Sequence, residues 1–210
     1  MNAVSTDHRN AEDKPWALVA GGSGGIGSAV CAELAATGWN VALTYRSNLA
    51  AAEAAAEVVA AKGGLSKVAA LDLCDVESVQ ALISELDADG GVHGVVYAAG
   101  PPIRMDYVSN THPDRLRDQL NGDSVACYTL LQSSLTALRP RHGSMVAISS
   151  PAVVRYPKRD MLSSAPKAVV EAMVRAIAAE EGRFGVRANC VGTGLIEAGM
   201  WNDLHAHGDY

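Results

Sequence analysis

The run of small residues from Gly21 to Gly27 has the sequence GGSGGIG and lies between an apolar segment and a segment of helical character. Glycine at position 21 permits a tight turn, Gly25 lets the backbone approach a pyrophosphate, and Gly27 lets the following helix pack closely. The N-terminus of that helix would present N–H groups to phosphate oxygens. The run therefore predicts a dinucleotide site, with a mobile glycine loop as the alternative. The residues predicted to bind are Gly21, Ser23, Gly25, Ile26 and Gly27.

The residues that follow the apolar segment 40–45 indicate which dinucleotide would bind. An acidic residue there would pair with the ribose hydroxyls of NAD, but the run Thr44-Tyr45-Arg46-Ser47-Asn48 contains no acid. Arg46 can form a charge-assisted pair with a 2′-phosphate, so NADP(H) is the predicted cofactor. The alternative is that Arg46 is a solvated surface residue. Asp72 is predicted to meet the adenine edge, and its alternative is a turn or helix-cap aspartate.

The elements that would position these residues alternate along the chain. Strands are predicted at 16–20, 40–45, 67–72, 92–98, 144–149 and 186–191. Helices are predicted from the glycine run to about Thr37 and at 49–62, 76–86, 124–138 and 169–181, with Asp75 as a cap. Apolar strands separated by long crossovers are typical of an α/β fold of Rossmann type, a doubly wound parallel sheet with helices on both faces. We expect this single domain to span 15–210, after a disordered polar tail at 1–14.

Composition excludes several classes of function. The 210 residues carry a formal net charge of −6, which argues against a nucleic-acid partner. No apolar run is long enough to span a bilayer, and the polar start of the chain lacks the apolar centre of a signal peptide, so a cytoplasmic location without membrane contact is expected. The cysteines lie far apart and form no CxxC pair, which predicts reduced core thiols and no metal site.

Several of these motifs, in this order, resemble the short-chain dehydrogenase/reductase family of classical type. The matching residues are Ala20-Gly21, Gly25-Ile26-Gly27, Asp72, Ala98-Ala99-Gly100, Ser150, Lys167 and Asn189–Gly194. The string Tyr45-Arg46-Ser47-Asn48 looks like the NADPH-dependent 3-oxoacyl-carrier-protein-reductase-like branch. The resemblance implies that Ala99, Gly100, Lys167 and Gly194 also contact the cofactor.

The resemblance also implies a catalytic set, from which this chain departs. A serine after the fifth strand, matched by Ser150, would hydrogen-bond the substrate carbonyl. The family places a proton-donating tyrosine thirteen residues later and a lysine four beyond it, which correspond to Ser163 and Lys167. Asp123 takes the place of an asparagine that completes the proton relay. Serine is a weaker acid than tyrosine and a shorter side chain, so the proton relay is predicted to be atypical.

Each catalytic assignment has a plainer alternative. Lys167 could be a surface lysine, Ser150 a strand-end cap, and Ser163 a helix-entry residue. Tyr156 and His112 are further loop candidates for the proton, with packing and a helix start as their alternatives. Two functions follow: an NADPH-dependent reductase of a small ketone or 3-oxoacyl-like carbonyl, or a catalytically impaired NADP(H)-binding sensor or partner subunit.

The resemblance carries two expectations about the whole chain. Family members usually continue beyond the loop after Gly194 with a helix and a last parallel strand. A chain that ends at Tyr210 is therefore expected either to be truncated in its substrate loop or to complete its sheet in another way. The helices near 124–138 and 168–181 match those that form the family's dimer interface. Their alanine-rich faces predict a homodimer or homotetramer.

Overall fold

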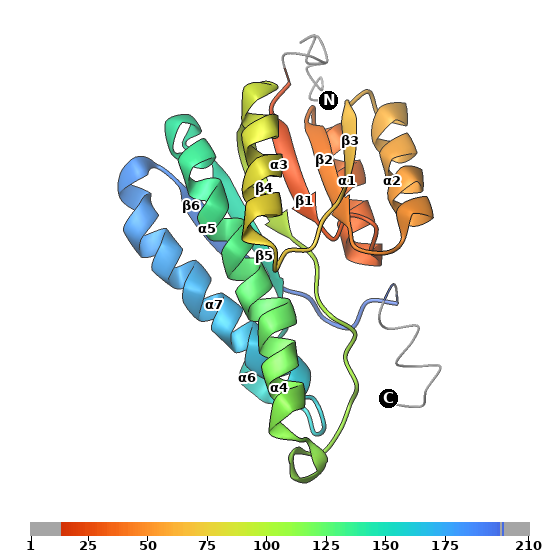
Figure 1. Cartoon of the computed structure of the whole chain (residues 1–210), viewed down its shortest axis with the longest axis vertical. Coiled ribbons are helices and arrows are strands. Elements are labelled where there is room, and N and C mark those ends of the chain that lie inside the picture. Colours follow the sequence, from red (N-terminus) through yellow and green to blue (C-terminus); the bar gives the residue numbers. More distant parts are fainter. Residues whose placement is uncertain (1–13, 198, 200–210) are drawn as a thin grey trace, which may run out of the picture.

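The computed structural model describes residues 14–197 and 199 and is built on a parallel sheet of six strands (Figure 1). The strands lie in the order β3-β2-β1-β4-β5-β6, and every neighbouring pair is parallel. The bounds are β1 Trp16–Ala20, β2 Asn40–Tyr45, β3 Ser66–Ala70, β4 Val92–Tyr97, β5 Ser144–Ser149 and β6 Arg187–Gly192. The order reverses between β1 and β4, and in such sheets ligands bind beyond the carboxyl ends of the strands at that point.

Helices cover both faces of the sheet, as predicted. The bounds are α1 Gly25–Ala36, α2 Leu49–Ala61, α3 Val76–Ala88, α4 Pro113–Gln119, α5 Ala126–Leu138, α6 Ala152–Arg155 and α7 Met161–Glu181. Helices α3, α5 and α7 lie side by side on one face, while α1 and α2 lie against the β1–β3 end on the other (Figure 1).

The core explains why the central strands are continuous apolar runs. Leu18 and Val19 are adjacent in β1 and both fully buried, yet they belong to different core clusters. Leu18 packs in the cluster that includes Leu130 of α5, and Val19 in the cluster that includes Val59 of α2. Because successive side chains point to opposite faces, a strand covered on both sides needs apolar residues at every position.

Side chains cap several helices, but not the helix after the glycine run. Asp75 caps α3, as predicted, by accepting hydrogen bonds from the Ser78 N–H at 3.2 Å and the Ser78 hydroxyl at 2.6 Å. Asn48 caps α2 through the Ala51 N–H at 3.0 Å. Helix α1 follows Gly24 with no side-chain cap. Its first N–H groups are therefore available to an anion.

Several element boundaries differ from the predictions. The third strand ends at Ala70, so Asp72 lies in the loop beyond it. A π-helical turn, Leu120–Val125, precedes α5, because tertiary contacts described below engage its backbone. Helix α7 begins at Met161 rather than 169 and includes Pro166. The sixth strand starts one residue later than predicted, at Arg187. Helix α6 was not predicted, and α4 was predicted only as a helix start at His112.

Other expectations meet mixed outcomes. Residues 1–13 of the predicted tail, and the chain end after 199, lie outside the described residues. Cys31 and Cys127 are buried as predicted, but Cys74 is exposed, which corrects its assignment as a core thiol. In the described part of the chain, no helix combines the length and apolar character needed to cross a bilayer. The same residues contain no cluster of three His, Cys, Asp or Glu side chains suited to a metal ion.

Candidate active site

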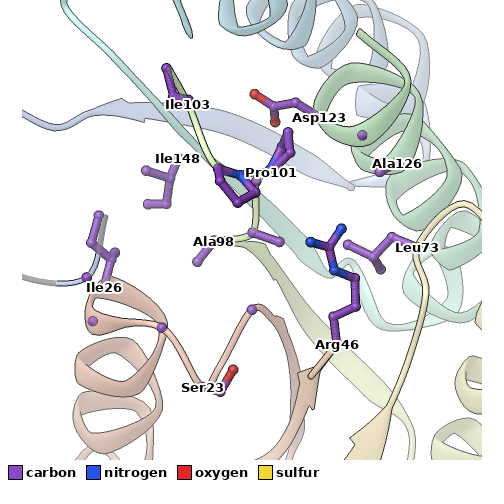
Figure 2. A pocket seen from close by; sticks show the side chains of 18 of the residues that line it. Ser23, Ile26, Arg46, Leu73, Ala98, Pro101, Ile103, Asp123, Ala126 and Ile148 are labelled. Atoms are coloured by element: carbon purple, nitrogen blue, oxygen red, sulfur yellow. The ribbon is translucent and has the colours of Figure 1, made fainter. Parts of the chain in front are cut away.

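A cavity of about 520 Å³ opens at the carboxyl ends of the strands (Figure 2). Every residue that the sequence placed in the site lines this cavity except Gly27, which is buried beneath the turn. The predicted residues in its wall are Gly21, Ser23, Gly25, Ile26, Arg46, Asp72, Ala99, Gly100, Asp123, Ser150, Ser163, Lys167 and Gly194. Residues from distant parts of the chain therefore meet in one cavity of ordinary ligand-binding size.

The glycine turn closely follows β1 and leaves no room for side chains. Gly21 has a φ of +80°, and a Cβ there would lie 2.7 Å from the Ala98 carbonyl oxygen at the end of β4. A Cβ on Gly27 would lie 2.1 Å from the Gly21 carbonyl oxygen. Gly27 therefore allows α1 to pack on the turn itself, not only on the strand. The bare turn and the uncapped start of α1 fit the diphosphate of a dinucleotide.

The adenosine end of the cavity would lie between β2 and the loop after β3. Figure 2 shows the Arg46 side chain pointing from the end of β2 into the cavity. The Asp72 carboxylate accepts a hydrogen bond from the Cys74 N–H at 2.9 Å, as expected of a turn aspartate. Asp72 also lines the cavity. Cys74, which the sequence analysis did not place here, lines the same wall.

Two adjacent serines at the end of β5 have different environments. The Ser149 hydroxyl is buried and donates its proton to Glu171 Oε1 of α7 at 2.6 Å. Ser150 Oγ accepts from the Ala152 N–H at 3.2 Å, which matches the cap alternative. A hydroxyl that accepts one hydrogen bond still has its proton to donate. Ser150 can therefore cap the turn and also donate into the cavity.

Helix α7 brings Ser163 and Lys167 into the cavity wall from the same side. They are four residues apart and so lie on one face of the helix. The hydroxyl of Ser124, in the π-helical turn, donates to the Pro166 carbonyl oxygen at 3.0 Å and ties that turn to α7. Lys167 is therefore held in the cavity wall, and the surface-lysine alternative is wrong.

Lys167 is paired with an acid inside the cavity. Its Nζ lies 2.9 Å from Asp123 Oδ1, and the side chains are only 13% and 7% exposed. Tyr97, the last residue of β4, contacts the same carboxylate, with its hydroxyl 2.8 Å from Asp123 Oδ1. Burial and the Asp123 charge raise the pKa of the Tyr97 phenol well above its usual value. The sequence analysis missed this role for Tyr97, although its place at the end of a central strand was a usable signal.

The other proposed proton sources lie elsewhere. Tyr156 follows α6, is exposed, and does not line the cavity. His112 caps α4 through the Asp114 N–H at 3.3 Å, as its alternative predicted.

Asp160 is buried at the start of α7; burial raises its pKa, and a hydrogen bond from the Ser163 side chain opposes that shift.

Comparison with known proteins identifies related sequences. A family model described as enoyl-(acyl carrier protein) reductase matches residues 20–209. A 3-oxoacyl-[acyl-carrier-protein] reductase from Aggregatibacter actinomycetemcomitans is 28% identical, over 89% of this chain and 78% of that protein. A 2,5-dichloro-2,5-cyclohexadiene-1,4-diol dehydrogenase from Sphingobium indicum is 31% identical, over 87% of this chain and 73% of that protein.

Solved structures show the same architecture. A short-chain dehydrogenase from Burkholderia cenocepacia in complex with NADP superimposes with a TM-score of 0.82 at 28% identity, over 91% of this chain and 78% of that one. An NAD⁺-bound xylitol dehydrogenase gives a TM-score of 0.85 at 23% identity, over 94% of this chain and 75% of that one, and supports the fold alone.

Proposed function

The chain belongs to the short-chain dehydrogenase/reductase family, and from that premise we propose that it is an NADPH-dependent oxidoreductase that reduces a ketone or 3-oxoacyl-like carbonyl. One observation carries the proposal. The glycine turn, Arg46, Ser150 and Lys167 line a single cavity at the point where the strand order reverses. The resemblance to a 3-oxoacyl-[acyl-carrier-protein] reductase supports the class of substrate.

The residues in the cavity suit NADP(H) in two places. The backbone of the glycine turn and the first N–H groups of α1 would hold the diphosphate. The Arg46 guanidinium would hold a 2′-phosphate, and no acidic residue follows β2 to favour NAD. When bound, the cofactor supplies the hydride, which is chemistry that the side chains do not have.

The protein's own contribution is to orient the carbonyl and manage the proton. Ser150 would donate a hydrogen bond to the carbonyl oxygen and polarise it. Lys167 would hold the ribose, with Asp123 beside it as part of the relay. Ser163 stands where the family has its proton-donating tyrosine. Its hydroxyl is a poor acid, so we propose that the proton reaches the product alkoxide through Ser163 or water at a reduced rate.

A second function has its own supporting observation. Asp123 already pairs with Lys167, so the lysine charge is partly neutralised by a neighbour rather than directed at an acidic phenol. This arrangement favours a catalytically impaired NADP(H)-binding protein that acts as a sensor or partner subunit. The two proposals predict the same cofactor affinity and differ in turnover.

The test compares NADPH oxidation by the wild type and by Ser163→Tyr across a panel of ketones and 3-oxoacyl thioesters. The reductase proposal predicts measurable wild-type oxidation and a rise of about 10²-fold or more in kcat for the variant, the usual contribution of a positioned acid. If the wild type binds NADPH but oxidises none, and Ser163→Tyr does, the sensor proposal replaces it. Loss of NADPH binding in the wild type would contradict both.

A further inference from the structure

A buried cluster of Tyr97, Asp123 and Lys167 lies at the inner end of the cavity. Lys167 Nζ and the Tyr97 hydroxyl lie 2.9 Å and 2.8 Å from the same carboxylate oxygen, Asp123 Oδ1. The Lys167 ammonium also lies 5.1 Å from the centre of the Tyr97 ring. Tyr97 is fully buried, and the side chains of the other two are nearly so. Burial and mutual contact therefore restrict each of the three side chains to one position.

Tyr97 fixes Asp123 through two contacts rather than one. Its hydroxyl lies 3.0 Å from the Asp123 backbone carbonyl oxygen as well as 2.8 Å from the carboxylate. The Asp123 carbonyl oxygen, in the π-helical turn Leu120–Val125, also accepts from the Ala126 N–H. Because a carbonyl oxygen has two lone pairs, it can accept from the Tyr97 hydroxyl as well. A phenol between two oxygen acceptors of one residue contacts both its backbone and its carboxylate, and so fixes the position of the carboxylate.

The arrangement leaves one carboxylate oxygen outside the cluster. Both side-chain contacts end on Oδ1, and Asp123 also lines the cavity, so Oδ2 is the oxygen that takes part in neither contact. The Lys167 ammonium has three N–H groups, of which one faces Asp123. Two adjacent residues of the cavity wall therefore carry an acceptor and donors, and Tyr97 contacts the acidic one.

Beside the ribose contact that the family resemblance already implies for Lys167, we propose that Asp123 Oδ2 accepts hydrogen bonds from the vicinal hydroxyls of the nicotinamide ribose, and that Tyr97 is the positioning residue for this carboxylate. The inference rests on the proposed cofactor. A carboxylate suits a diol because it can accept hydrogen bonds from both hydroxyls, as an acidic residue does at the other ribose in NAD-binding folds. The ion pair with Lys167 offsets part of the cost of placing a carboxylate in this buried position.

Two variants and two ligands test the proposal by calorimetry. Tyr97→Phe removes only the hydroxyl, and Asp123→Asn removes the charge at nearly constant volume. NADPH carries the nicotinamide ribose, whereas adenosine 2′,5′-bisphosphate carries the adenosine half alone. Both variants are expected to bind NADPH about tenfold more weakly, the cost of a hydrogen bond to a charged group, and to bind the bisphosphate like wild type within about twofold. Tyr128→Phe, on the exposed side of α5, is the matched control and should change neither affinity.

The ratio of the two affinities separates positioning from damage to the fold. A merely structural role for Tyr97 would weaken both ligands equally in Tyr97→Phe, and that result would overturn the proposal. Unchanged NADPH affinity in Asp123→Asn would also overturn it, even if Tyr97→Phe failed to fold. A wild type that binds the bisphosphate but gains nothing from the nicotinamide half would overturn the inference alone. A wild type that binds neither ligand would overturn the proposed function with it.

Discussion

Tyr97, whose ring lies beside Lys167, has an environment that suits holding a proton rather than donating it. Tyr97 lies 5.1 Å from the lysine, yet its phenol is buried and its pKa is raised well above 10.0, first by burial and then by Asp123. A nearby cation would have the opposite effect, but here the carboxylate is closer to the hydroxyl. Tyr97 therefore cannot stand in for the phenol that is absent at Ser163.

Arg46 is the residue on which the choice of cofactor depends. We predict that Arg46→Ala weakens NADPH binding about tenfold or more and leaves NADH binding unchanged within about twofold, because only NADPH has a 2′-phosphate for the guanidinium. Titration of each cofactor by calorimetry measures both values. Lys62→Ala, a cation at the end of α2 outside the cavity wall, is the control. An equal loss for the two cofactors would assign Arg46 to the fold instead.

At the scale of elements, local sequence signals predicted the bounds of several strands well. The bounds of β1, β2 and β5 match the predictions because apolar runs flanked by glycine or polar residues are visible without tertiary information. The helix predicted at 169–181 begins earlier, at Met161, and contains Pro166; proline lacks an N–H and is usual only near a helix start, so the sequence does not predict the first turns of α7. Only the start of α4, at His112, was predicted, because the run Pro113–Gln119 has one apolar position besides its proline and thus little periodicity.

The parts of the site that escaped prediction depend on contacts between distant residues. Parallel strands place their carboxyl ends together, so the glycine turn, Asp72 and Ser150 could be assembled from the sequence. The Tyr97 contact spans 26 positions, and the Ser124 contact with Pro166 spans 42. Neither pair has a spacing rule, and the π-helical turn that both contacts stabilise cannot be inferred from local propensity.

The ends of the helical layer are joined by an ion pair whose effect depends on pH. Arg139, after α5, contacts Glu181, the last residue of α7, at 2.7 Å and 2.8 Å through two parallel hydrogen bonds. The hydrogen bonds from Arg139 lower the pKa of Glu181 below its ordinary value of 4.5. A carboxyl whose folded-state pKa is depressed stabilises the fold above its unfolded pKa, and the stabilisation is lost as the pH falls through the folded pKa.

Glu181→Gln should therefore lower Tm by about 2–4 °C at pH 7, and the difference from wild type should shrink as the pH falls below about 4.5. Thermal unfolding followed by circular dichroism at several pH values measures this. Arg117→Gln, which breaks the exposed pair with Asp114, should leave Tm nearly unchanged at every pH. A Tm difference for Glu181→Gln that is constant with pH would show that packing, not charge, stabilises this corner.

At the scale of the whole molecule, the outer side of the α5 and α7 layer is the surface on which we expect a second copy to dock. Val125 and Tyr128 are each 49% exposed and lie three residues apart, on one side of the helical run that continues into α5. Val169 of α7 is 40% exposed, and the Ser124 contact with Pro166 brings the two helices together near it. Apolar residues gathered on one side favour burial in an interface.

We predict a particle of at least twice the chain mass of 21.8 kDa in size-exclusion chromatography with light scattering. Tyr128→Arg should reduce it to a single chain, because a charge in the middle of an apolar interface has no water or partner to solvate it. Val108→Glu changes an exposed apolar residue away from these helices and should leave the assembly intact. A wild type of single-chain mass would contradict the predicted interface. Equal dissociation by both variants would show that the interface lies elsewhere or that added charge acts nonspecifically.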